Sequence, residues 1–120
     1  MKKLFATILL CCSLACTSPD KIPDDVMGIE QMKPIVWDMM RAGILVQNQF
    51  RLDTANQKKE TAANYQKVFA IYGTTKDAFY HSYQYYLDHP DKHKVLLDSV
   101  VAYANRERIE LFKKIHEKEK

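Results

Sequence analysis

The chain has 120 residues, enough for one small domain, and its 18 Lys and Arg against 15 Asp and Glu give a formal net charge of +3. All three cysteines lie within the first sixteen residues, so the rest of the chain excludes a disulfide framework and a thiolate zinc site.

The first fifteen residues predict a cleaved secretory signal peptide. Lys2 and Lys3 precede an uncharged apolar run, LFATILLCCSLA (4–15), which is shorter than the about 20 residues that a membrane-spanning helix needs. Cleavage after Ala15 removes two lysines and leaves 16 basic against 15 acidic residues, so the formal charge falls from +3 to +1. A charge this small gives nucleic-acid binding little support.

The segment SLAC (13–16) resembles a bacterial lipoprotein signal, in which cleavage leaves a lipid-bearing cysteine as the first residue. Small residues flank Leu14 as in that signal, but Ser13 stands where Leu is usual. We expect lipidation of Cys16. Two alternatives remain open: ordinary cleavage after SLA with a free cysteine, and lipidation of Cys12.

Residues 16–29 are expected to carry the lipid anchor and an extended tether. TSPDKIPDDVMG (17–28) contains two prolines, three aspartates and a glycine, and its twelve residues reach at most about 40 Å. By analogy with lipoproteins, Thr17 in place of Asp favours the outer membrane over the inner one. The single Asp in TSPDK favours the periplasmic face over the cell surface.

Residues 30–120 predict an all-α domain, a small bundle of about four helices. A first helix over 30–50 carries an apolar stripe at helical spacing, and Pro34 would have to lie in its first turn. The polar segment 51–57 is expected to be a loop. The stripe of the first helix comprises Met32, Ile35, Val36, Met39, Ala42, Gly43, Val46 and Phe50.

A second helix is expected over about 58–72, with Gly73 as its C′ residue and with Ala62, Tyr65, Val68, Phe69 and Tyr72 facing inward. A third helix over about 75–88, with Thr74 and Asp77 as a capping box, would bury Phe79, Tyr83, Tyr86 and Leu87.

A fourth helix should begin at Pro90 and run toward the end of the chain. Its expected buried stripe is Leu97, Val100, Val101, Ala104, Leu111 and Ile115. Arg108 interrupts that stripe, so burial should stop near Asn105, and residues 106–120 are expected to project as a charged helix, with Glu110 and Lys114 as a supporting pair.

The segment IYGTTKDAFYHSYQYYLDHPDKHKVLLDSV (71–100) resembles an uncharacterised family of small Bacteroidota lipoproteins, domain of unknown function 4296. The most specific part is YYLDHP (85–90), which fits a Tyr-Tyr-x-x-His-Pro signature, and MKPIVWDMMRA (32–42) is similar to the first helix of that family. The resemblance implies a lipoprotein signal and an all-helical body. It implies no activity, because none is established for the family.

Two histidines four residues apart, His89 and His93, raise the question of a metal or acid–base site. Pro90 lies between them, so they are not on one continuous helix, and no Glu follows His89 to act as a base. We interpret Asp88, His89 and Pro90 as a helix-capping corner, in which Asp88 or His89 caps the fourth helix. His93 is then expected on the surface. We predict no metal site.

A second apolar strip on the first helix, Trp37, Met40 and Ile44, lies opposite its core stripe. A bundle this small rarely covers both faces of a helix, so either the end of the fourth helix packs over Trp37 or the strip binds a partner. We take these three residues as the candidate partner-binding site.

No nucleophile–base motif and no phosphate-binding Gly loop occur in the sequence, so we predict no catalytic residues and no cofactor. The expected function is a non-catalytic interaction or assembly subunit of an outer-membrane complex, anchored by lipid and bound to a protein partner. A glycan- or peptide-binding module that uses exposed tyrosines is the alternative, followed by a small enzyme.

Overall fold

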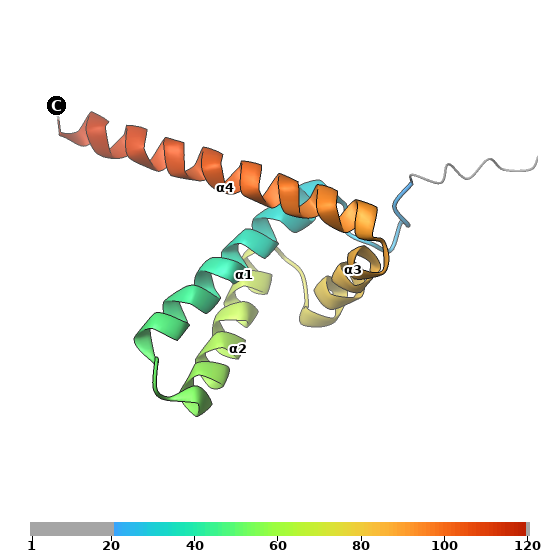
Figure 1. Ribbon diagram of the computed structural model, residues 1–120, viewed down its shortest axis with the longest axis horizontal. Helices are drawn as coiled ribbons and strands as arrows, with labels where there is room; N and C mark the ends of the chain where they lie inside the picture. Colours follow the sequence, from blue (N-terminus) through green and yellow to red (C-terminus); the bar gives the residue numbers. More distant parts are fainter. Residues whose placement is uncertain (1–20, 120) are drawn as a thin grey trace, which may run out of the picture.

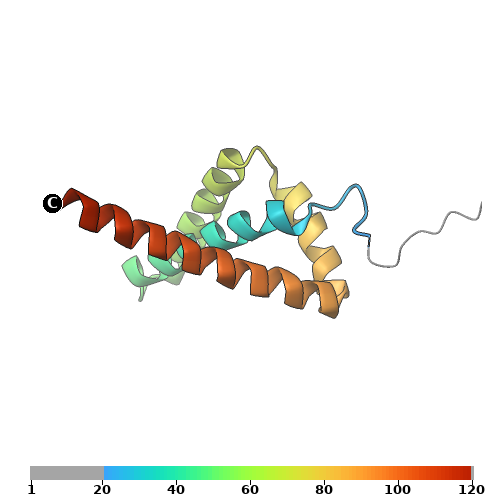
Figure 2. The ribbon, with the colours of Figure 1, turned by 90° about the horizontal axis from the view of Figure 1, so that it is seen from above.

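Four helices make up the fold of residues 21–119, which are the residues that this computed structural model describes: α1 (Ile29–Gln49), α2 (Thr54–Ile71), α3 (Lys76–Asp88) and α4 (Pro90–Lys118). α1 and α2 form an antiparallel hairpin, while α4 crosses α1 and then runs on past it (Figure 1; from above, Figure 2). These residues contain no strand, so the expected all-α bundle is confirmed. The predicted signal (1–15) and Cys16 lie outside the described residues.

The core forms where α1 meets the other three helices. α1 contributes the largest share, Met32, Ile35, Val36 and Met39, as its apolar spacing predicts. α2 adds Val68 and Phe69, α3 adds Phe79 and Tyr86, and α4 adds Leu96 and Val100. Among residues 21–119, no helix is both long enough and apolar enough to cross a membrane.

The helix starts follow from their capping residues, and one expected start and one expected capping residue are wrong. α2 begins at Thr54, within the expected loop, because the Asp53 carboxylate accepts a 3.0 Å hydrogen bond from the Asn56 amide. α3 is capped by Thr75 rather than Thr74, because the Thr75 hydroxyl accepts from the Ala78 amide. Gly73, with φ at +62°, ends α2 as expected.

Pro34 does not lie in the first turn of α1, because that helix already begins at Ile29. The proline therefore occupies the second turn and cannot donate the helical hydrogen bond to the Glu30 carbonyl. The core contacts of Ile35 and Val36, which follow it, hold the helix together at this point.

The segment before α1 packs on α3 instead of forming a free tether. The two backbone groups of Met27 both bind α3 side chains: its N–H donates to the Ser82 hydroxyl at 2.9 Å, and its carbonyl accepts from Tyr86 at 2.8 Å. Val26 is buried in the core and Ile22 packs against it. Residues 21–28 of the tether expected over 16–29 are therefore docked on the domain, and we call them the lead-in; residues 16–20 lie outside the described residues.

α4 buries only part of the expected stripe: Val100 is buried as expected and Ala104 is half-buried. Leu96 and Val100 are buried, whereas Leu97, Val101, Leu111 and Ile115 are exposed. From Asn105 to Glu119 every side chain is exposed, and this part of α4 projects beyond the bundle (Figure 1). Leu87 of α3, also expected in the core, is exposed as well, and Ser82 takes an inward position instead.

Candidate functional site

A groove opens where α4 leaves α1, and its volume is about 540 Å³. Trp37 lies at the α1 side, half-buried against the core. We call it the Trp37 groove; it is lined by Trp37 and Arg41 of α1 and by Ala104, Asn105, Glu107, Arg108, Glu110, Leu111 and Lys114 of α4. Of these residue types, tryptophan and arginine are the ones enriched at protein-binding hot spots.

Three basic and two acidic side chains line the Trp37 groove. The guanidinium of Arg41 lies over the Trp37 ring, 5.6 Å from its centroid, which is within cation–π range. This contact presents a flat, positively charged surface at the groove wall. The groove therefore combines apolar contact area with charges of both signs, with a slight excess of positive charge.

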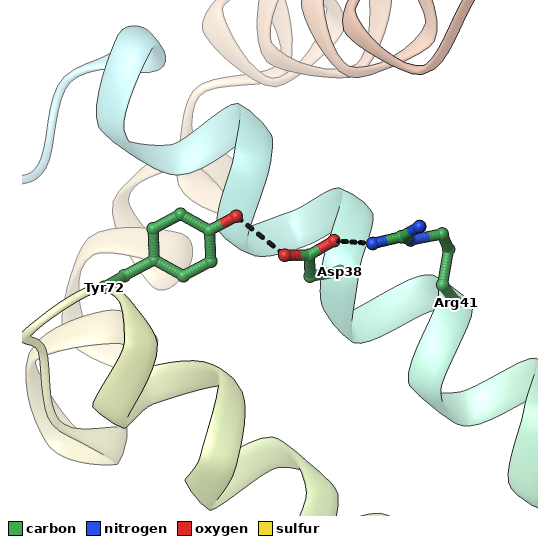
Figure 3. Close-up of polar contacts among 3 residues, drawn as sticks. All are labelled: Asp38, Arg41 and Tyr72. Carbon is green, nitrogen blue, oxygen red and sulfur yellow. Dashed lines mark hydrogen bonds and ion pairs between the residues drawn. The ribbon is translucent and has the colours of Figure 1, made fainter. Parts of the chain in front are cut away.

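Arg41 is held in place by a polar cluster that joins α1 to α2 (Figure 3). Tyr72, at the end of α2, donates a 2.7 Å hydrogen bond to the Asp38 carboxylate, and Arg41 donates to the other carboxylate oxygen. Burial, and then the hydrogen bond to Asp38, raise the pKa of Tyr72 well above its usual value. Tyr72 thus stays protonated as a donor, and Asp38 orients Arg41 toward Trp37.

α4 joins the same electrostatic environment through Tyr103. Burial is the main cause that raises the pKa of the Tyr103 hydroxyl, followed by the negative charges of Glu107 and Asp38. Arg41 acts in the opposite direction. Groups from α1, α2 and α4 therefore interact electrostatically around Arg41, which lines the Trp37 groove.

The three residues of the predicted partner-binding strip do not share one environment. Trp37 is half-buried and faces α4 across the groove, whereas Met40 and Ile44 are 49% and 54% exposed farther along α1. Trp37 and α4 thus border the same groove, while Met40 and Ile44 are exposed apolar side chains on the same face of α1, and binding of a partner there stays a prediction.

A family model described as "Domain of unknown function (DUF4296)" matches residues 23–110, which is 88 of the 120 residues. The chain belongs to the DUF4296 family. No curated protein and no solved structure matches it. The DUF4296 match begins within the lead-in and ends inside the projecting part of α4, so it contains Trp37, Arg41 and the cluster around Asp38.

The YYLDHP stretch of this DUF4296 chain (85–90) builds the corner between α3 and α4. Tyr86 is fully buried and its hydroxyl binds the lead-in. The His89 ring stacks on Tyr85, with centroids 4.1 Å apart, and its Nδ1 lies 2.7 Å from the Tyr85 carbonyl oxygen. Pro90 is the first residue of α4. These contacts give the YYLDHP stretch a structural role: it forms the corner and attaches the lead-in to α3.

The capping prediction for this corner needs correction. His89 occupies the N-cap position of α4, but no side chain caps that helix, because the His89 ring binds Tyr85 instead. Asp88 accepts a hydrogen bond from Gln84 of α3. His93, expected on the surface, is half-buried with its Nε2 3.4 Å from the Tyr83 hydroxyl.

The tyrosines divide between two sides of α3. Tyr80 faces a second groove, between α2 and α3, with a volume of about 350 Å³, whereas Tyr85 packs on His89. We call the former the Tyr80 groove; it is lined by Gln57, Lys58, Thr61, Ala62, Tyr65, Gln66, Phe69, Lys76 and Tyr80. Aromatic rings beside amides and lysines could stack on and hydrogen-bond to a sugar or a peptide.

The histidines that could support catalysis have separate partners. His81 pairs with Asp25 of the lead-in at 2.9 Å, and this hydrogen bond is the main reason why the pKa of Asp25 is lowered. His89 contacts Tyr85 and His93 contacts Tyr83. Within residues 21–119, no three His, Cys, Asp or Glu side chains gather as a metal site would require.

Sequence reasoning missed the contacts that join distant segments, namely Tyr72 with Asp38 and Met27 with α3. Tyr72 was predicted to face inward, but nothing in a helical pattern indicates which polar group a buried hydroxyl will reach. A partial signal existed, since a buried tyrosine generally finds a hydrogen-bond partner.

Proposed function

We propose that this chain is a lipid-anchored cell-envelope protein that serves as a non-catalytic interaction or assembly subunit of an outer-membrane complex. It would be attached through Cys16 and face the periplasm. The SLAC segment supports the anchor. The similarity of YYLDHP to the Tyr-Tyr-x-x-His-Pro signature of Bacteroidota lipoproteins supports the envelope location.

One observation carries the interaction role: Trp37 lines a groove, and the exposed side chains of Met40 and Ile44 follow it at helical spacing on the same face of α1. Tryptophan and arginine are the residue types most enriched at interface hot spots, and Arg41 lies directly over Trp37. Because Asp38 and Tyr72 already orient Arg41, a partner would lose little side-chain entropy on binding here.

The position of the lead-in favours access to this groove. The six residues from Cys16 to Lys21 span at most about 20 Å, so a lipid on Cys16 would keep the lead-in and α3 near the membrane. The projecting end of α4 lies at the opposite end of the molecule from the lead-in (Figures 1 and 2). A partner in the envelope space could therefore reach the groove.

Site-specific photo-crosslinking tests the partner site. We expect a photoreactive residue at Met40 to give one discrete crosslinked product in intact cells, because that position is exposed beside the groove. The same residue at Leu87, which is similarly exposed but lies on α3, is the matched control and should give none. Trp37→Ala should reduce the Met40 product by about tenfold or more, as hot-spot truncations do.

Equal crosslinking at both positions, or a Met40 product that Trp37→Ala leaves unchanged, would count against this site. Circular dichroism of the Trp37→Ala protein shows whether the fold has survived. Ile44→Asp serves as a second variant, because Ile44 is exposed and its replacement should leave the core intact.

The anchor has its own test. We expect the intact mass of the chain extracted from membranes to correspond to residues 16–120 plus acyl groups, and Cys16→Ser to release the protein from the membrane fraction. Cys12→Ser is the control, because it removes only the alternative site. A membrane-extracted chain with no added acyl mass would disprove lipidation.

A second candidate function, glycan or peptide binding, is favoured by one observation: Tyr65 and Tyr80 share the Tyr80 groove with two glutamines and two lysines. The Tyr80 and Gln66 amide signals should then shift in NMR titrations with oligosaccharides or short peptides. Tyr80→Ala should abolish those shifts. If no probe shifts them, this candidate fails without affecting the Trp37 groove.

A further inference from the structure

α4 carries two apolar faces, and the fold of a single chain uses only one of them. Leu96 and Val100 are buried in the core. A second row, which we call the α4 stripe, comprises Leu97, Val101, Ala104, Leu111 and Ile115, and four of its members are 40%, 60%, 59% and 44% exposed in that order, with Ala104 half-buried. From Leu97 to Ile115 the stripe is about 27 Å long.

The spacing along the stripe is that of a coiled-coil seam. Leu97, Val101, Ala104, position 108, Leu111 and Ile115 follow one another at alternating intervals of four and three residues. This heptad spacing keeps the apolar side chains on one side of a helix, where a second helix can pack. Only Arg108 departs from the apolar pattern. A continuous exposed apolar row of this length marks an interaction surface.

We propose that the α4 stripe pairs with the same stripe of a second copy of this chain, with the two helices antiparallel. In a parallel pair, Arg108 would face Arg108 of the other copy, which places two like charges in the seam. In an antiparallel pair centred between Arg108 and Leu111, each Arg108 faces a Leu111 and each Ala104 faces an Ile115. The seam is thus the part of the stripe from Ala104 to Ile115, because in this register Val101 faces Lys118 and Leu97 lies beyond the paired positions. Small side chains then oppose large ones.

Charges beside the stripe fit the antiparallel arrangement. Glu107 and Lys114 flank the seam on one side, seven residues apart, and neither forms an ion pair within residues 21–119. Glu110 pairs with Lys113 rather than with Lys114 as the sequence suggested, which leaves Lys114 available. In the antiparallel pair, Glu107 of each copy lies beside Lys114 of the other, so the surface is complementary to itself.

This inference goes beyond the proposed function and does not depend on it. The pairing needs none of the α1 residues Trp37, Met40 and Ile44, and it requires no other protein. The two surfaces overlap on α4: Ala104 and Leu111 of the stripe line the Trp37 groove, and so do Glu107, Arg108 and Lys114 beside them. A bound second copy would therefore extend one wall of that groove.

The test uses the chain with Cys16→Ser, which removes the proposed lipid but alters no described residue, under reducing conditions. We expect sedimentation equilibrium to show a dimer whose fraction rises with concentration. Leu111→Glu should abolish the dimer. Leu87→Glu is the matched control, because it makes the same substitution at an exposed leucine of α3, and it should leave the dimer unchanged. Circular dichroism checks that both variants keep their helices.

Charge reversal tests the orientation. Glu107→Lys and Lys114→Glu should each weaken the dimer, roughly tenfold or more, by creating two like-charge contacts. The double variant should restore it, because each swapped pair again has opposite signs. A protein that stays monomeric at every concentration overturns the proposal. A double variant as weak as the single ones, or a dimer that Leu111→Glu leaves intact, overturns it as well.

Discussion

At the scale of single residues, the Tyr72 hydroxyl joins two helices and also positions a charge. It donates to Asp38, and Asp38 accepts from Arg41, whose guanidinium covers Trp37. The side chain of Asp38 is only 21% exposed, so its charge needs both donors. A change at the end of α2 is therefore expected to reach the groove wall on α1, two contacts away.

The raised pKa of Tyr72 predicts a loss of stability at high pH. Its unfolded value is near 10.0, and burial together with Asp38 raises the folded value above that. The stabilisation is therefore complete below pH 10 and is lost as the pH rises through the folded pKa. At neutral pH we expect Tyr72→Phe to cost about 1–2 kcal/mol of unfolding free energy.

The difference in unfolding free energy between the wild type and Tyr72→Phe should shrink as the pH rises above 10. Above that pH the Tyr72 hydroxyl ionises in the unfolded wild type, whereas the phenylalanine of the variant has no group that can ionise. Urea unfolding at neutral and alkaline pH measures both values. Asp38→Asn is an informative companion, since it keeps an acceptor for Tyr72 but removes the charge. A difference that stays constant with pH would contradict this account.

At the scale of helices, sequence periodicity located apolar rows but did not show which neighbour would cover them. On α1 the row with Met32, Ile35 and Met39 is the core row, because both α2 and α4 pack against that helix. On α4 the expected row with Leu97 and Leu111 is exposed, since the helix contacts the bundle through the adjacent face. Adjacent apolar residues fit either face, and only the tertiary packing decides between them.

The start of α2 shows another limit of the sequence pattern. RLDTANQ (51–57) is polar throughout, which suggested a loop, but Asp53 is a strong N-cap residue and the helix begins immediately after it. The candidate site, like the helix starts, could be predicted only in part. The sequence singled out Trp37, whereas Asp38 and Tyr72, which organise its surroundings, are 34 residues apart in the chain.

Gly73 is the one described residue whose conformation requires glycine. Its φ is +62°, and a Cβ built there would meet no atom within 4 Å, so only the backbone conformation opposes a side chain. We expect Gly73→Ala to lower the unfolding free energy by about 1–2 kcal/mol. Gly28→Ala is the matched control, because that site is equally open and has an extended backbone with φ at −68°.

At Gly28 the loss of a favourable N-cap residue and the reduced entropy of the unfolded chain act in opposite directions, so the change should be close to zero. Chemical unfolding of both variants gives the comparison. If the two alanines cost the same, the positive φ of Gly73 would not be the reason for its presence between α2 and α3.

At the scale of the whole molecule, the lead-in determines how the domain can sit on a membrane. Its contacts place Met27 against α3. α4 begins at the α3–α4 corner, and its 29 residues carry its C-terminal end about 43 Å away from that corner. If Cys16 carries lipid, the short stretch before Ile22 leaves the domain little freedom to move away. The α4 stripe and the Trp37 groove would then keep a defined position relative to the bilayer.

The lead-in should detach when its link to α3 is weakened. Ser82 is buried, and its hydroxyl accepts the hydrogen bond from the Met27 amide. We expect Ser82→Ala to speed hydrogen exchange at the Met27 amide by about tenfold, the equivalent of one net hydrogen bond. The Val26 amide, which donates to the Pro23 carbonyl inside the lead-in, is the internal control.

Exchange at Met27 that remains as slow as in the wild type would mean that Tyr86 and Val26 hold the lead-in without Ser82. A Met27 amide that exchanges as fast as an unfolded peptide already in the wild type would show that the lead-in is not docked, and that the domain moves freely on its tether.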